Sequence, residues 1–195
     1  MATTLTKPKL PAREMSDEQF LAFLEPRPHH ERWELIDGEP VMMNPPKLRH
    51  QKIGGNIAMV LNLHFQQARP ELCALQEIGL HIPGIRRFRP RPDVAVIDDQ
   101  VDLETSWADR FLLVAEVLSD SNTPRHIERK RQHYLQHPLN LYVLIIAQRE
   151  VSVEVWSRST DWQQTTLTRL DQELDLADLG LTIPLSRLYS GTKVA

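Results

Sequence analysis

The sequence predicts a mixed α/β or α+β fold, in which helices flank a central sheet and a β-hairpin lies near the N-terminus. A near-continuous apolar run from Phe111 to Leu118 has the length of one strand and the composition of a strand covered on both faces. Helical periodicity precedes and follows this run, over residues 48–68 and 124–137. Helical and strand patterns that alternate along one chain are typical of a sheet with helices packed against it.

The N-terminal part of the chain predicts a short helix and a hairpin. Ser16 and Gln19 have the spacing of a capping box ahead of an apolar stretch, and the prolines that follow end this helix. Within residues 33–43, the pair Asp37-Gly38 separates two stretches of alternating apolar residues. Such a pair between alternating stretches is a strong hairpin signal.

The rest of the chain predicts strands around the second long helix. Pro124 suits the first turn of that helix, and Pro138 ends it. Residues 98–109 are acidic and predict an exposed loop, while residues 183–189 predict a last helical turn that packs on the body. The predicted strands cover residues 72–78, 80–82, 93–97, 111–118, 141–146, 151–156 and 162–170.

Length and composition indicate a globular protein. The 195 residues suit one domain with its own core, which we expect over residues 16–190, preceded by a flexible tail of residues 1–15. No apolar run approaches the roughly 18 residues of a membrane span, and the tail lacks the apolar centre of a secretory signal. A single cysteine, Cys73, excludes an internal disulfide and fits a reducing cytoplasm.

Two carboxylates are placed where strands begin or end. Asp93 precedes the apolar stretch Val94–Ile97, and Glu116 interrupts the apolar run near the end of the next long strand. An unpaired buried carboxylate is costly, so Glu116 must lie at a strand end, pair with a cation or bind a metal ion. Two acids on neighbouring strands have the chemistry to hold Mg²⁺, which prefers oxygen ligands and usually takes one or two carboxylates. Such a metal supports phosphodiester hydrolysis.

Basic residues cluster beside both carboxylates, although the net charge is −3. Phosphate contacts require such clusters only where the nucleic-acid backbone lies, so these residues are candidates for nucleic-acid binding. The alternative is that both runs are ordinary solvated faces. The candidates are Arg86, Arg87, Arg89 and Arg91 before Asp93, and Arg125 and Arg129 after Glu116.

The order of these motifs resembles the PD-(D/E)XK nuclease superfamily, and more specifically the Uma-two family of restriction-endonuclease-like proteins. The resemblance covers about residues 16–190. It rests on the order and spacing of several motifs rather than on any one of them. These motifs are Trp33–Glu39, His50-Gln51, Arg91–Val96, Val114–Ser119, Lys130 with Tyr134 four residues later, and Leu141–Leu144.

The resemblance implies a restriction-endonuclease-like fold and a metal-dependent endonuclease acting on DNA. It assigns the metal, Mg²⁺ or Mn²⁺, to Asp93, Glu116 and the main-chain carbonyl of Val117. It takes the lysine from the following helix, as Lys130, and adds Glu34 and His50 as further candidates for the metal or water shell. Because many nucleases that cut both strands act as dimers, a homodimer is a further expectation.

The chain departs from the family pattern at several positions. Leu118 stands where the superfamily's usual lysine lies, and His126 replaces an aspartate often found four residues before the helical lysine. Residues 126, 130 and 134 share one helix face, so Lys130 can reach the strand ends from that face. Two alternatives to an active nuclease remain open. One is a nuclease-fold module that binds nucleic acid without cutting it, and the other is an accessory protein acting on a protein partner.

Overall fold

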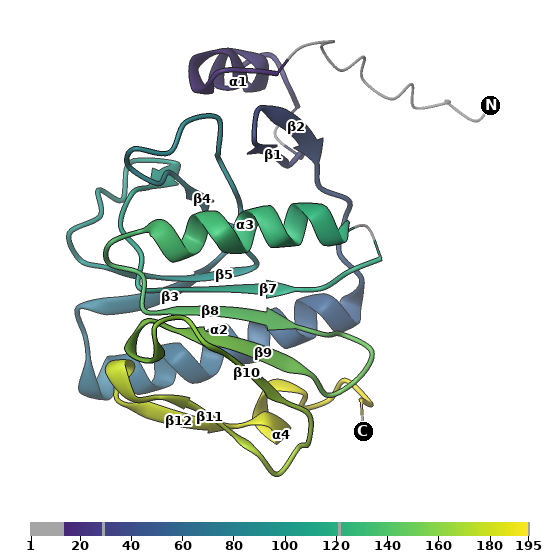
Figure 1. The fold of residues 1–195 in the computed structure, drawn as a ribbon, viewed down its shortest axis with the longest axis vertical. Helices are drawn as coiled ribbons and strands as arrows, with labels where there is room; N and C mark the ends of the chain where they lie inside the picture. The colour runs from purple at the N-terminus through teal and green to yellow at the C-terminus, as the bar shows by residue number, and fades with distance from the viewer. Residues whose placement is uncertain (1–13, 29, 121, 195) are drawn as a thin grey trace.

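A six-stranded mixed sheet forms the centre of the structure, a computed structural model that describes residues 14–28, 30–120 and 122–194 (Figure 1). The strand order is β10-β9-β8-β7-β5-β3. β7 and β8 pair in parallel, and the other neighbours pair antiparallel. The strands are β3 Leu72–Gln76, β5 Val94–Asp98, β7 Leu113–Val117, β8 Tyr142–Ile146, β9 Val153–Ser157 and β10 Gln164–Leu167.

Two long helices cover opposite faces of this sheet: α2 (Leu48–Ala68) lies behind it and α3 (Pro124–Gln136) in front of it in Figure 1. Side chains of a strand alternate between the two faces. In β7, Ala115 and Val117 pack in the core on the α2 side, whereas Val114 packs with residues of α3. Glu116 therefore points toward α3. This is the predicted mixed architecture, and it decides which helix can reach the buried carboxylate.

The predicted N-terminal elements are confirmed. Helix α1 (Asp17–Leu24) begins with the capping box of Ser16 and Gln19. Strands β1 (Trp33–Ile36) and β2 (Glu39–Met42) form the hairpin. Its turn needs left-handed backbone, which Asp37 and Gly38 adopt with φ of 50° and 87°. Aspartate and glycine tolerate such angles better than most residues, which explains why this pair marks the turn.

The hairpin is fixed to the segment that leads into β5. Leu35 and Arg89 exchange two backbone hydrogen bonds, of 3.0 Å and 2.8 Å. All four residues of β1 are buried, and this strand contacts α3. The hairpin therefore carries its residues onto the face of the sheet that α3 covers.

The C-terminal part differs from the prediction. The expected helical turn is present as α4 (Leu185–Leu188), but a two-stranded pair, β11 (Glu173–Leu176) and β12 (Leu181–Pro184), precedes it. The stretch expected as a strand over 80–82 is β4 (Gly79–Leu80), which pairs outside the main sheet with β6 (Trp107–Ala108) in the acidic loop. The remaining short elements are the 3-10 turns η1 Arg158–Thr160 and η2 Ala177–Leu179.

The expected tail of residues 1–15 lies outside the described residues except at its end. There, Met15 is buried, and its N–H donates to the carbonyl of Gly38 at 2.8 Å, so this residue belongs to the folded structure. None of the helices in the described part of the chain combines the length and the apolar character needed to cross a lipid bilayer.

Candidate active site

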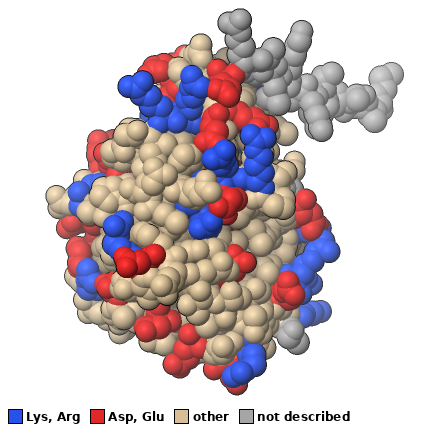
Figure 2. Space-filling model, viewed as in Figure 1, with Lys and Arg blue, Asp and Glu red and all other residues tan. Residues whose placement is uncertain are grey.

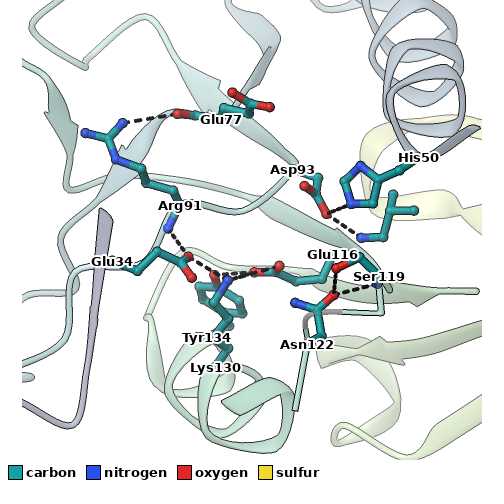
Figure 3. A network of polar contacts seen from close by, with 11 residues as sticks. Glu34, His50, Glu77, Arg91, Asp93, Glu116, Ser119, Asn122, Lys130 and Tyr134 are labelled. Carbon is teal, nitrogen blue, oxygen red and sulfur yellow. Dashed lines mark hydrogen bonds and ion pairs between the residues drawn. The ribbon is translucent and has the colours of Figure 1, made fainter. Parts of the chain in front are cut away.

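The ends of two neighbouring strands bring Asp93 and Glu116 together (Figure 3). β5 runs antiparallel to β7 with Val94 opposite Ala115, so the residue before β5 lies beside the end of β7. Asp93 and Glu116 are 9% and 3% exposed. One oxygen of Asp93 accepts the N–H of Val117 at 2.6 Å, which fixes this carboxylate against the end of β7.

Lys130 reaches this pair from α3. Its Nζ lies 3.1 Å from both carboxylate oxygens of Glu116 and 2.6 Å from Oε1 of Glu34 (Figure 3). One helical turn later, the hydroxyl of Tyr134 donates to Oε1 of Glu116 at 2.7 Å. The expected helix face is therefore present, and Glu116 accepts three hydrogen bonds from it.

The hairpin and α2 each contribute one more residue. Glu34 is buried at 5% exposure, and its Oε1 accepts the backbone N–H of Arg91 at 2.7 Å. His50, in the first turn of α2, has Nε2 3.4 Å from Oδ2 of Asp93. Glu34, His50, Asp93, Glu116 and Lys130 thus come from five different elements or their ends and form one buried cluster.

The cluster contains more acidic side chains than basic ones. Burial raises the pKa of Glu116 to about 7, and the charges of Asp93 and Glu34 add to this rise, while Lys130 opposes it. Burial alone would lower the pKa of Lys130, but Glu116 and Glu34 raise it above its ordinary value. Lys130 therefore stays charged beside two carboxylates, with a third at Asp93.

A cavity of about 280 Å³ opens onto these carboxylates. In the described part of the chain, no set of three or more His, Cys, Asp or Glu side chains is arranged as a ready-made metal site. Mg²⁺ does not need one, because it keeps several waters and commonly uses one or two carboxylates. The oxygen donors and the surplus negative charge fit a hard divalent cation, which would offset that charge.

The sequence profile of a family described as "Uma2: Putative restriction endonuclease" matches residues 17–186. The chain belongs to the Uma2 family. The resemblance drawn from the motifs is thereby confirmed, and this Uma2 chain is a member of a family of restriction-endonuclease-like nucleases. No curated protein sequence matches it significantly.

A solved structure supports the fold of this Uma2 chain. It is the crystal structure of "a putative nuclease belonging to DUF820" from Anabaena variabilis ATCC 29413, with a TM-score of 0.74. The match covers 91% of this chain and 99% of the other at 18% sequence identity. The likeness confirms the predicted mixed sheet flanked by helices.

The four arginines before Asp93 are mostly engaged elsewhere. Arg87 pairs with Glu14 and Arg89 with Asp17, at 2.5 Å and 3.6 Å, which ties the loop to the N-terminal region. Arg91 donates to the carbonyl of Glu77 at 3.2 Å, and its guanidinium lies over the ring of Trp107. Arg86 is exposed.

The two candidate arginines of α3 also lie away from the cavity wall. Arg125 and Arg129 are exposed, and Arg129 pairs with Asp37 at 3.2 Å. Figure 2 shows basic side chains in the upper part of this face, near α1 and the hairpin, interleaved with acidic ones. None of the six candidate arginines lines the cavity. Their contact with nucleic acid stays a prediction that the cavity itself does not support.

Tyr134 and Gln148 lie near the carboxylates, but the sequence pattern assigned neither of them a role in the site. Tyr134 was expected on the helix face of Lys130, and its hydroxyl donates to Glu116 directly. Gln148 follows β8, lines the cavity and is only 6% exposed. No local pattern marks Gln148, because its position depends on the parallel pairing that sets β8 beside β7.

The raised pKa of Glu116 predicts a stability change with pH in the metal-free protein. The pKa of Glu116 is about 7 in the folded protein and 4.5 in its ordinary, unperturbed state. The protonated carboxyl group therefore contributes to the free energy of unfolding fully below pH 4.5, and this contribution is lost as the pH rises through 7. The expected loss is about 3 kcal/mol. Urea denaturation of wild type and Glu116→Gln between pH 4 and about 8 isolates this group, since glutamine does not titrate. A difference between the two proteins that does not change with pH would contradict the prediction.

Proposed function

We propose that this Uma2 chain is a metal-dependent endonuclease that hydrolyses phosphodiester bonds in DNA. The observation that carries the proposal is the buried cluster of Asp93, Glu116 and Lys130 beside a cavity, with more negative than positive charge. Asp93, Glu116 and the carbonyl of Val117 would hold Mg²⁺, and Mn²⁺ would take the same oxygen ligands. We expect the protein to act in the cytoplasm, and as a homodimer where both strands are cut.

Each protein group has a distinct role in this proposal. A bound cation polarises the phosphate and lowers the pKa of a bound water. Lys130 balances the charge that develops on the phosphate, from a position held by Glu34. Tyr134 orients Glu116 through the hydrogen bond to Oε1.

His50 and Arg91 support the acids from outside the metal shell. Burial lowers the pKa of His50, but the hydrogen bond and charge of Asp93 outweigh burial, so the pKa lies above its ordinary value. His50 can therefore donate to Asp93 and hold its orientation. The backbone N–H of Arg91 does the same for Glu34. Groups of this kind keep ligating side chains in place.

A second candidate function is a nuclease-fold protein that binds DNA without cutting it. The observation that favours it is His126, which stands in place of the family's common aspartate and lines the cavity. Its Nε2 lies 3.5 Å from Oε2 of the exposed Glu39, so it adds no acid to the metal region. Salt-sensitive DNA binding without cleavage in Mg²⁺ or Mn²⁺ would favour this alternative.

Metal binding itself is a testable part of the proposal. A cation held at one hundred times its dissociation constant stabilises the folded state by about 2.7 kcal/mol, which corresponds to several degrees in Tm. We expect Mg²⁺ and Mn²⁺ to raise Tm by this order in differential scanning fluorimetry, and NaCl at matched ionic strength to leave it unchanged. Supercoiled plasmid should be nicked or linearised with Mg²⁺ and stay intact with EDTA. If neither Mg²⁺ nor Mn²⁺ shifts the Tm or supports cleavage, the metal-dependent function is rejected.

A further inference from the structure

Three charged side chains meet at the rim of the cavity. Nζ of Lys47 lies 2.6 Å from Oδ2 of Asp120, and Nη2 of Arg149 lies 2.7 Å and 2.8 Å from Oδ1 and Oδ2 of Asp120. They come from three connections, β2–α2, β7–α3 and β8–β9, and we call them the rim triad. Lys47 and Asp120 line the cavity, and Arg149 is joined to them through Asp120.

The rim triad is an exposed arrangement with an anion at its centre. The side chains of Lys47, Asp120 and Arg149 are 67%, 51% and 67% exposed. Exposed ion pairs contribute little to stability, so a competing anion can replace Asp120 at small cost. Hydrogen bonds from Lys47 and Arg149 lower the pKa of Asp120, so it remains charged at neutral pH.

A neighbouring residue points to an external partner. Gln148, directly before Arg149, lines the same cavity, and its amide makes no hydrogen bond to another described residue. The amide is not among the fully buried polar atoms that lack a partner, so it is accessible from the cavity, where water or a ligand can satisfy it. An amide that faces a cavity can donate its N–H to a phosphate oxygen.

We propose that Lys47, Arg149 and Gln148 bind a backbone phosphate of a nucleic-acid strand, and that Asp120 occupies this phosphate position in the free protein. The inference rests on the proposed function for its substrate class. Arginine and lysine are common ligands of both carboxylates and phosphates. A backbone phosphate has one negative charge and two free oxygens, as a carboxylate has, so it can take the place of Asp120 between these two cations. The phosphate contacts of the cavity then come from two loops, β2–α2 and β8–β9, rather than from the six arginines suggested by the sequence.

The test is equilibrium binding of a fluorescent DNA duplex to the full chain in EDTA, measured over a range of salt concentrations. Asp120→Asn removes the internal anion and is expected to tighten binding about twofold to fivefold, the range set by exposed ion pairs. The double variant K47A/R149A is expected to weaken binding at least about tenfold at low salt. Its salt slope should fall by about 1.8, since each lost phosphate contact removes about 0.9.

A matched ion pair provides the control. Arg169 and Asp171 lie 2.9 Å apart at 68% and 72% exposure, and neither lines the cavity. R169A and D171N are expected to bind DNA like the wild type. Gln148→Met separates binding from folding: it should weaken DNA binding about threefold or more while Tm stays equal or rises, because the amide has no partner to lose.

The outcomes separate this inference from the proposed function. The phosphate-binding rim is overturned if the wild type binds DNA and both K47A/R149A and D120N bind it with the same affinity and salt slope as the wild type. This conclusion holds whether or not the protein cuts DNA. Absence of any DNA binding by the wild type would overturn it as well. Altered binding in these variants without cleavage in Mg²⁺ or Mn²⁺ would support the rim and reject the nuclease.

Discussion

Asp93→Asn is expected to abolish DNA cleavage while leaving the fold intact. Asparagine keeps the volume of the side chain and an oxygen that can accept the Val117 N–H, which Asp93 accepts at 2.6 Å. It removes the negative charge and one proposed metal ligand. Metal catalysis supplies several kcal/mol to phosphoryl transfer, so we expect a loss of at least about a thousandfold in the cleavage rate. The measurement is single-turnover cleavage of a labelled duplex in saturating Mg²⁺.

Stability and a matched aspartate complete this test. Removing one of three clustered acids should keep or raise the Tm of the metal-free protein, and the Mg²⁺-induced rise in Tm should disappear. Asp98 lies at the other end of β5 and pairs with Arg110 at 2.6 Å. Asp98→Asn should cost stability but retain cleavage. Full cleavage by Asp93→Asn, or an equal loss in Asp98→Asn, would show that the proposed metal site is wrong.

The elements that were predicted correctly depend on local chemistry. Asp37-Gly38 tolerates the backbone that the hairpin turn requires, and Thr123 with Pro124 forms the start of α3. The β7 run was identified because a strand covered on both faces must be apolar throughout, and all five of its residues are buried. These features need no knowledge of distant residues.

The β11–β12 pair was missed because its pattern is weak. β11 reads Glu-Leu-Asp-Leu, with only two buried residues. Two strands of four residues bury little apolar surface on their own. This pair instead contributes Leu174 and Ile183 to the core that α2 covers. Such short strands depend on tertiary packing more than on intrinsic preference.

In the candidate site, too, some residues are marked by local sequence patterns and others are placed only by contacts between distant parts of the chain. Asp93 and Glu116 were recognisable as acids at strand ends, and the structure places them side by side. The burial of Glu34 was not recognisable, since it requires the pairing of Leu35 with Arg89, more than fifty residues later. Gln148 and the rim triad also depend on loops that meet only in the folded chain. Local patterns thus indicated the carboxylates, while the residues that surround them needed the structure.

Lys130→Met is expected to cause the largest loss of stability among these variants. Nζ of Lys130 lies 2.6 Å from Glu34 and 3.1 Å from Glu116, and the side chain is 4% exposed. Methionine fills a similar volume but leaves the buried carboxylates without the cation that contacts them. Breaking a buried pair on one side costs about 3–5 kcal/mol, and we expect a loss of this order near pH 8. Denaturant unfolding in EDTA measures it.

The pH and metal dependence of Lys130→Met distinguish lost charge from lost packing. Lys130 lowers the pKa of Glu116, so without it Glu116 should retain its proton to higher pH, and the destabilisation should shrink as the pH falls toward 5. Mg²⁺ should raise the Tm of Lys130→Met more than that of the wild type, because the cation replaces the missing charge, while cleavage stays lost. Lys52→Met, on the exposed side of α2, should change neither property. A destabilisation of Lys130→Met that is independent of both pH and Mg²⁺ would indicate packing alone, and would remove the electrostatic basis for placing a cation among these carboxylates.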